Sequence, residues 1–126
     1  MDNYFIQAQR VRRRIQEDFN QVFALSHPLY SKETKVVDDG EKRVDVLLAP
    51  CSLSPAPLLS DVLAEKSPLN SYVNDVLTVP ASLAGIPALC IPVPGSTPGD
   101  EPVGMQLLAQ YGDEDALFNI ANALAK

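Results

Sequence analysis

Apolar residues recur at helical spacing near both ends of the chain. At the N-terminal end, steps of three and four residues place one apolar set on a single face, which predicts a helix from about Tyr4 to Leu25. The residues of that face are Tyr4, Ala8, Val11, Ile15, Phe19 and Val22. A final helix is expected over Asp113 to Ala125, because its acidic start suits the positive end of the helix dipole. Its apolar face consists of Ala116, Leu117, Ile120, Ala121 and Leu124.

Three short, nearly continuous apolar runs predict buried strands. They cover Val44 to Ala49, Ala88 to Val93 and Val103 to Ala109, and their length favours a strand over a helix. Pro92 weakens the second strand or marks its end, because proline cannot donate to a sheet ladder.

Between the first two strands the pattern predicts further helical segments. Leu58 to Glu65 suits a short helix. Ser67-Pro68 is a helix-start signal, and a helix from there is expected to run to about Thr78. Pro80 would then begin a separate turn, which Gly85 would close. Helices that alternate with buried strands indicate a layered α/β fold, with 26–43 as an exposed charged loop.

Size and charge narrow the functional classes. The 126 residues suit one domain or part of one. A net charge of -6 disfavours direct binding of nucleic acid, which needs clustered Lys and Arg. No apolar run is long enough to span a bilayer, so no membrane span is expected. The Arg-rich start also contains Asp2, Glu17 and Asp18, which is unlike a mitochondrial transit peptide.

The reactive side chains give little evidence of a self-contained active site. Cys51 and Cys90 are expected to be small buried hydrophobes, with a disulfide or redox pair as the alternative. His27 is the single histidine, so a zinc site is not expected, and its polar loop predicts exposure rather than catalysis. No G-x-S-x-G elbow and no S-x-x-K pair occurs in the sequence.

The segment from Tyr72 to Leu108 carries an ordered series of short signals. The matching positions are Asp75, Thr78, Pro80, Leu83, Ala84, Gly85, Pro87, Pro102, Gly104 and Gln106. In this order they resemble the C-terminal end of the amidase-signature family, roughly D-x-x-T-x-P-x-N-L-A-G-x-P, a strand, then P-x-G-x-Q. Ser82 departs from the usual Asn. The resemblance implies that residues 1–126 are a C-terminal segment of an amidase domain. Its α/β/α layered fold with a mixed sheet would be incomplete on its own.

A second match lies on the first helix, where Ala8, Gln9, Val11 and Arg12 fit the family pattern A-Q-x-V-R. Within the family, the sequence most resembles the A-subunit branch of the glutamyl-tRNA(Gln) amidotransferases, especially the fungal mitochondrial members. That branch hydrolyses glutamine and supplies ammonia to convert Glu-tRNA(Gln) to Gln-tRNA(Gln) in translation. The resemblance implies that Arg12 and Asp75 hold the two ends of the glutamine.

The residues themselves leave alternatives open at both positions. Arg12 lies on the flank of the apolar face, where a rigidly held guanidinium can grip a carboxylate. It could instead belong to a solvated face or pair with Glu17 or Asp18. Asp75 could be an ordinary surface residue or a helix cap.

The family's Ser-Ser-Lys triad has no match here, since nothing like Gly-Ser-Ser-Gly-Gly occurs in the sequence. The chain alone is therefore expected to be inactive. The resemblance implies no cofactor in this chain, because ATP and Mg²⁺ belong to a partner subunit. It also implies other amidotransferase subunits as partners, tRNA contact only indirectly, and the mitochondrial matrix if the fungal branch is right, otherwise the cytoplasm.

Three alternatives remain beside that interpretation. The chain could be a fragment of a general amidase. It could be a non-catalytic chain that docks onto a partner through exposed strand edges. It could also be a truncated product that exposes apolar edges and aggregates.

Overall fold

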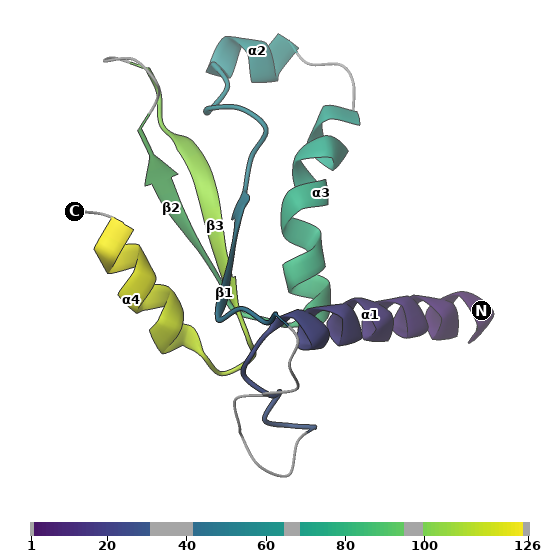
Figure 1. Cartoon of the computed structure of the whole chain (residues 1–126). Coiled ribbons are helices and arrows are strands. Elements are labelled where there is room, and N and C mark those ends of the chain that lie inside the picture. Colours follow the sequence, from purple (N-terminus) through teal and green to yellow (C-terminus); the bar gives the residue numbers. More distant parts are fainter. Residues whose placement is uncertain (1, 31–41, 65–68, 95–99, 125–126) are drawn as a thin grey trace.

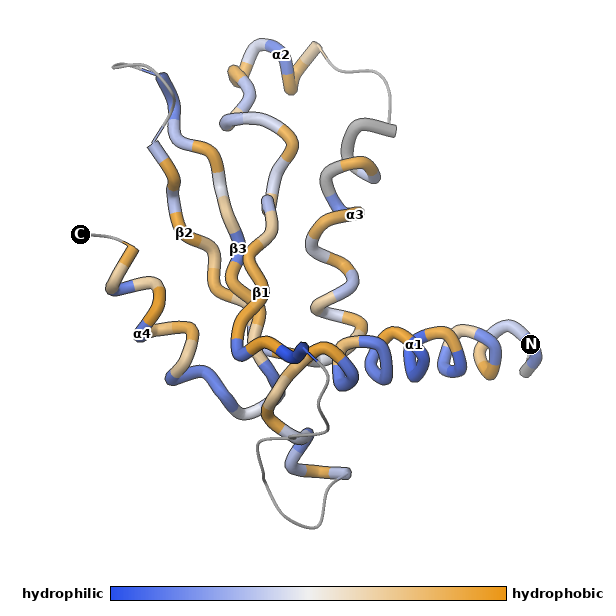
Figure 2. The backbone as a smooth tube through the Cα atoms, viewed as in Figure 1, coloured by the Kyte–Doolittle hydropathy of each residue, from blue (hydrophilic) through white to orange (hydrophobic). Residues whose placement is uncertain are grey.

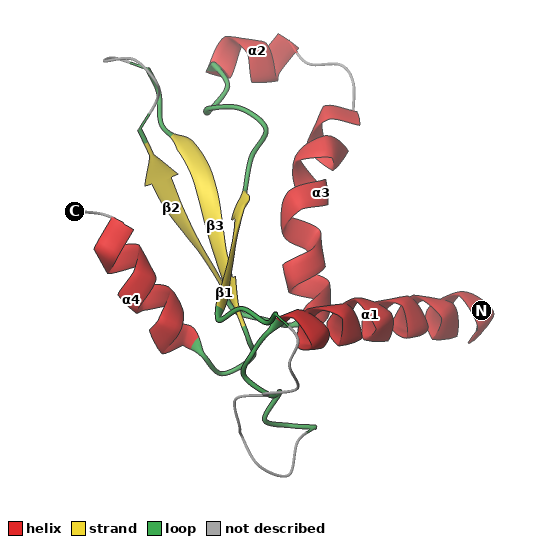
Figure 3. Ribbon diagram, in the orientation of Figure 1, coloured by secondary structure: helices red, strands yellow, loops and turns green. Residues whose placement is uncertain are grey.

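The computed structural model describes residues 2–30, 42–64, 69–94 and 100–124, which form four helices and three strands (Figures 1 and 3). In chain order these are α1 (Asp2–Val22), β1 (Val46–Pro50), α2 (Leu59–Ala64), α3 (Leu69–Ala84), β2 (Ala88–Val93), β3 (Val103–Ala109) and α4 (Glu114–Leu124). The predicted bounds of β2 and β3 are confirmed, and α1, α2 and α4 agree to within a few residues.

The strands form an antiparallel sheet in the order β1-β3-β2. Successive side chains of a strand point to opposite faces. Leu107 and Ala109 accordingly pack with Leu117 of α4, while Leu108 packs on the other face with Phe23 of the α1 end and Ala84 of α3. The expected α/β/α layering is confirmed, and the hydropathy colouring in Figure 2 shows largely hydrophobic strands between the helical layers. Within the described residues the sheet is antiparallel rather than mixed.

The expectation that all three strands are buried is correct only for β3. Its last four residues, Gln106 to Ala109, are buried, because β3 has a neighbouring strand on each side and helices on both faces. β1 and β2 are the outer strands of the sheet and contain no buried residue. β1 also begins two residues later than predicted, since Val44 pairs with Phe23 in an isolated bridge.

Helix α1 forms as predicted, but only part of its apolar face is covered. Ile15 and Phe19 pack against the core, whereas Tyr4 is 89% exposed and Val11 is 55% exposed. Figure 1 shows the reason: α1 crosses the C-terminal end of α3, and its N-terminal half extends beyond the other elements. Arg43, which lies outside α1 in the sequence, caps the C-terminal end of this helix. Its Nη1 donates to the carbonyls of Asn20 and Gln21 at 3.2 and 2.8 Å.

The prediction that Pro80 begins a separate turn is wrong. Pro80 lies inside α3, which continues to Ala84. Proline lacks the N–H that would bind the carbonyl four residues earlier, so Pro80 weakens α3 at this turn. Gly85 ends α3 as predicted, with φ of +74°, the left-handed conformation that suits glycine at this position. Ser67 and Pro68 lie outside the described residues.

Candidate functional site

Arg12 lies in the middle of α1 and reaches the end of α3. Its Nε donates to the carbonyl of Leu83 at 2.8 Å, and one turn later Gln16 Nε2 donates to the carbonyl of Ala84 at 3.0 Å. These carbonyls lie in the last turn of α3, where a helix leaves its carbonyls without internal partners. Among the described residues the guanidinium has no other hydrogen bond or ion pair. Its two Nη groups are therefore free to grip a ligand carboxylate while the bond to Leu83 fixes its position.

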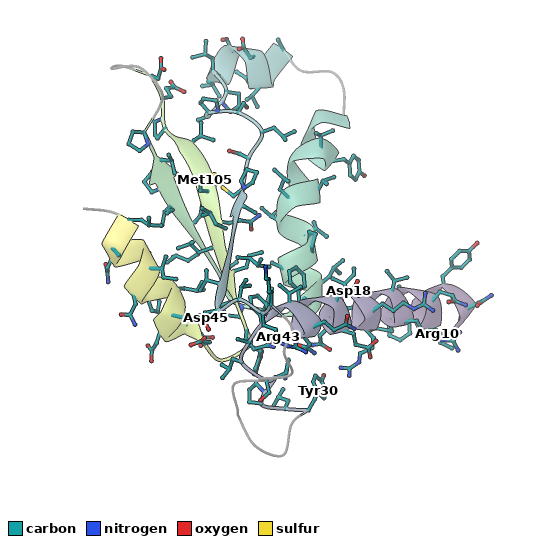
Figure 4. All side chains as sticks on the ribbon, in the orientation of Figure 1. Arg10, Asp18, Tyr30, Arg43, Asp45 and Met105 are labelled. Carbon is teal, nitrogen blue, oxygen red and sulfur yellow. The ribbon has the colours of Figure 1, made fainter. Side chains whose placement is uncertain are left out.

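The neighbouring arginines behave differently. Arg13 pairs with Glu17 at 2.9 Å and lies 4.2 Å from the ring centre of Tyr30. Glu17 is thus the partner of Arg13 and not of Arg12. In Figure 4, Arg10 lies toward the free N-terminal end of α1, while Arg43 and Tyr30 lie near its other end. Arg12 is the arginine of α1 that hydrogen-bonds α3.

Asp75 is the seventh residue of α3, so it is not a helix cap. Its side chain is exposed, and its carboxylate has no partner among the described residues. Thr78 Oγ1 donates weakly to the backbone carbonyl of Asp75 at 3.5 Å. The arrangement leaves an acidic group available to a cationic ligand on the helix that Arg12 holds.

The two candidate residues lie on packed helices but make no contact with each other in the described structure. Asp75 precedes Leu83 by eight residues, which is about 12 Å along a helix axis.

Gln106 attaches α3 to the sheet directly beside Asp75. It is buried at 4% exposure, and its Nε2 donates to the carbonyls of Leu77 and Pro50 at 2.8 and 3.0 Å. Leu77 lies between Asp75 and Pro80, so the bond supports the turn that Pro80 weakens. The sequence marked Gln106 as part of a motif but assigned it no role. The structure shows that it bonds the backbone of α3 two residues after Asp75.

The expectation that His27 is exposed is wrong. It is 5% exposed and stacks on Tyr111 with ring centres 5.0 Å apart. The N–H of Leu29 donates to His27 Nδ1 at 3.2 Å, which requires that nitrogen to be unprotonated. Burial, and secondly the positive charge of Arg13, lower the pKa of His27 below 6.5. His27 is therefore a neutral packing residue.

The expectation that the cysteines are buried hydrophobes is also wrong. Cys51 is half-buried, Cys90 is exposed, and their sulfur atoms lie 2.9 Å apart. Both are free thiols. No group of three or more metal-binding side chains occurs in the described part of the chain.

Two open surface hollows have described linings. One, of about 460 Å³, lies beside Met105 and Glu101, and the other, of about 430 Å³, lies beside His27 and Arg43. Neither includes Arg12 or Asp75. The described ranges contain no helix with the length and apolar character needed to cross a membrane.

The structure is thus an α/β/α sheet protein in which Arg12 of α1 hydrogen-bonds the end of α3, the helix that carries Asp75. A family model described as Amidase matches residues 1–118, and the chain belongs to the amidase family. The predicted family and fold are therefore confirmed.

The chain is similar to fungal and bacterial proteins of one kind. It is 53% identical over 124 residues to the mitochondrial A subunit of glutamyl-tRNA(Gln) amidotransferase from Tuber melanosporum, covering 98% of this chain and 25% of that protein. It is 47% identical to the Podospora anserina protein of the same name, covering 100% of this chain and 26% of that protein.

A solved structure supports the same comparison. The crystal structure of the glutamyl-tRNA(Gln) amidotransferase A subunit from Thermotoga maritima matches with a TM-score of 0.72 and 31% identity. The match covers 98% of this chain and 22% of that one. The chain thus spans about a quarter of the length of the relatives it matches.

Proposed function

We propose that this chain contributes the glutamine-binding side of the A subunit of a glutamyl-tRNA(Gln) amidotransferase. In this proposal Arg12 binds the α-carboxylate of glutamine and Asp75 binds its ammonium group. Hydrolysis of the side-chain amide then supplies ammonia for the conversion of Glu-tRNA(Gln) to Gln-tRNA(Gln). The 53% identity to the Tuber melanosporum protein over nearly the whole chain is the observation that carries the proposal.

The geometry supports a binding role for Arg12. The hydrogen bond from Nε to Leu83 uses one donor and leaves the two Nη groups for a carboxylate. Because the guanidinium is held before the ligand arrives, less side-chain entropy is lost on binding. Asp75 lies on α3, the helix to which Arg12 is hydrogen-bonded, so the packing of α1 on α3 fixes the positions of the two charges relative to each other.

Catalysis itself is assigned to residues outside these 126. The sequence contains no Gly-Ser-Ser-Gly-Gly segment for the nucleophile and no triad lysine near one. The chain alone is therefore expected to bind glutamine weakly and to hydrolyse none. ATP and Mg²⁺ chemistry is proposed for a partner subunit, and contact with tRNA is proposed to be indirect.

The proposed partners are the other amidotransferase subunits, and the proposed location is the mitochondrion, since the similar fungal proteins carry that word in their names. Large apolar side chains that are exposed on three helices are consistent with further protein contacts. Tyr72 of α3, Leu63 of α2 and Tyr4 of α1 are 68%, 77% and 89% exposed.

A chimera tests the proposal directly. The matching quarter of the Tuber melanosporum protein is replaced by residues 1–126 of this chain, and glutamine hydrolysis is measured with the partner subunits present. The chimera is expected to be active. Arg12→Ala and Asp75→Asn are each expected to reduce kcat/KM for glutamine by about 100-fold, because each leaves a ligand charge unpaired.

Arg10→Ala is the matched control, because Arg10 is exposed on the same helix and bonds no described residue. It is expected to leave kcat/KM unchanged. A small uncharged amide serves as a second substrate, and the Arg12 variant is expected to retain activity on it. Equal losses on both substrates would instead favour a general amidase. An active chimera that is insensitive to Arg12 and Asp75 would contradict the assigned roles.

A further inference from the structure

The two cysteines lie on opposite sides of the central strand. Cys51 directly follows β1, and its N–H donates to the carbonyl of Gly104 on β3 at 3.0 Å. Cys90 lies in β2 and pairs with Gln106 of β3. Alternation along β3 places Gly104 and Gln106 on the same face, so the two thiols also share that face. Their sulfur atoms meet at 2.9 Å, although the cysteines belong to segments that are not adjacent in the sheet.

Gly104 makes this meeting possible. A Cβ at position 104 would overlap with the sulfur of Cys51 and would lie 3.2 Å from the sulfur of Cys90. The sulfurs thus occupy the space that a side chain at position 104 would fill. This close approach does not arise from φ at Gly104, because only Gly85 and Gly112 have positive φ among the described residues.

We propose that Cys51 and Cys90 are a two-thiol redox site, which a peroxide oxidises to an intramolecular disulfide across β3. Disulfide sulfurs lie about 2.05 Å apart, and the two outer strands each lie about 4.8 Å from β3, so the strands must move closer together for the bond to form. Cys90 is exposed and Cys51 is half-buried, so a small oxidant can reach the pair. Neither thiol takes part in the hydrogen bonds of Arg12 and Gln106.

The reaction balances with one peroxide. The thiolate of Cys51 attacks one peroxide oxygen, the O–O bond breaks, and Cys51 becomes a sulfenic acid as hydroxide leaves. The sulfur of Cys90 then attacks the sulfur of Cys51, which forms the S–S bond and releases the second oxygen as water once the Cys90 proton is transferred. In sum, two thiols and one hydrogen peroxide give one disulfide and two waters.

The hydrogen bond with Cys51, together with burial, raises the pKa of Cys90 to about 11. The thiolate is the attacking form of a cysteine, so the raised pKa slows the reaction of Cys90 at neutral pH.

The test is oxidation of the whole chain with hydrogen peroxide, followed by trypsin digestion without reductant. Trypsin cleaves after Lys66, between the two cysteines, so a disulfide joins two otherwise separate peptides. We expect this joined pair, an intact mass lower by about 2 Da, and reversal by dithiothreitol. Cys51→Ser and Cys90→Ser are each expected to abolish the joined pair.

Two comparisons separate a built site from chance collision. The chain unfolded in urea is expected to close the bond at least about tenfold more slowly, because the thiols then meet only through a flexible segment. Gly104→Ala is expected to slow closure by about tenfold in the native chain, because disulfide geometry tolerates little displacement of the sulfurs. Circular dichroism checks that this variant is folded.

Equal rates in the native and unfolded chain would overturn the proposal. It would equally be overturned if the native chain gave only intermolecular dimers or sulfinic acids at Cys51 and Cys90. If Gly104→Ala does not fold, the comparison between native and unfolded chain decides the question alone.

Discussion

Replacement of Gln106 by Met tests whether one buried amide holds the Asp75 segment to the sheet. Methionine has a similar volume and length, so Gln106→Met keeps the packing and removes only the hydrogen bonds. The carbonyls of Leu77 and Pro50 each lose the donor that now lies 2.8 and 3.0 Å away. Gln106 itself is 4% exposed, but Leu77 is half-buried and Pro50 is exposed, so water replaces the amide more readily at Pro50 than at Leu77.

The expected loss follows from these two bonds. A buried polar group left without its partner costs about 1–3 kcal/mol. A carbonyl has two lone pairs and tolerates the loss of one donor better than an N–H tolerates the loss of an acceptor. The lower end of the range is therefore appropriate, about 1 kcal/mol for each carbonyl. The free energy of unfolding should fall by about 2 kcal/mol, a factor of about 30 in the folding equilibrium.

Urea unfolding followed by circular dichroism measures this change, with the slope on denaturant compared between variants. Hydrogen exchange adds a local readout, because the amides of α3 around Pro80 should lose protection more than those of α4. Gln9→Met is the matched control. Gln9 is exposed on α1, and the same substitution there should change stability by less than about 0.5 kcal/mol.

The reasoning is refuted if Gln106→Met and Gln9→Met have the same small effect. It is also refuted if Gln106→Met loses stability but exchange at α3 is unchanged. In the chimera, Gln106→Met should raise KM for glutamine by disturbing Asp75, while Gln9→Met should not.

Three further predictions concern single contacts. Gly85→Ala should lower the free energy of unfolding by about 1 kcal/mol, because a residue with a Cβ is strained at φ of +74°. No atom lies within 4 Å of the added Cβ, so the backbone conformation alone causes the loss. An unchanged urea midpoint would contradict this. Arg43→Met should cost at least about 1 kcal/mol through the lost cap on α1, measured as the loss of helical ellipticity on heating; full retention of that helix would count against the cap. His27 has a lowered pKa in the folded chain, so around and below pH 6.5 the unfolded chain binds more protons than the folded chain. The free energy of unfolding therefore decreases as the pH is lowered. His27→Gln should remove this part of the pH dependence in urea titrations between about pH 7 and 5, and an unaltered slope would show that other groups cause it.

The sequence pattern of α1 is that of a core helix, yet the N-terminal half of α1 projects from the fold and its apolar residues are exposed. Its periodic pattern correctly predicts a helix with one apolar face. Pattern alone does not specify what covers that face, and within the described residues only the Ile15 and Phe19 end is covered. The same applies to the strands, since an apolar run has the same appearance in an outer strand and in a central one.

The local elements and the family could be predicted from the amino-acid sequence without a structure. Periods of 3.6 and 2 residues follow from backbone geometry, so helices and strands are recognisable without knowledge of their partners. Gly85 is recognisable as a helix end for the same local reason. The ordered signals from Asp75 to Gln106 were enough to indicate the family, because the family motif consists of residue types at fixed spacings, which the sequence displays directly.

The roles of the polar and reactive side chains, in contrast, depend on which distant segments meet. Arg12 meets Leu83, Gln106 meets Leu77, and Cys51 meets Cys90 across 71, 29 and 39 positions of chain. His27 is buried by Tyr111 from the far end of the sequence. Local patterns carry no information about such distant pairs, because burial and hydrogen bonding depend on which elements pack together and in what register. The strand order β1-β3-β2 places Gly104 between the two cysteines, and no feature of the sequence near any of the three residues indicates that order.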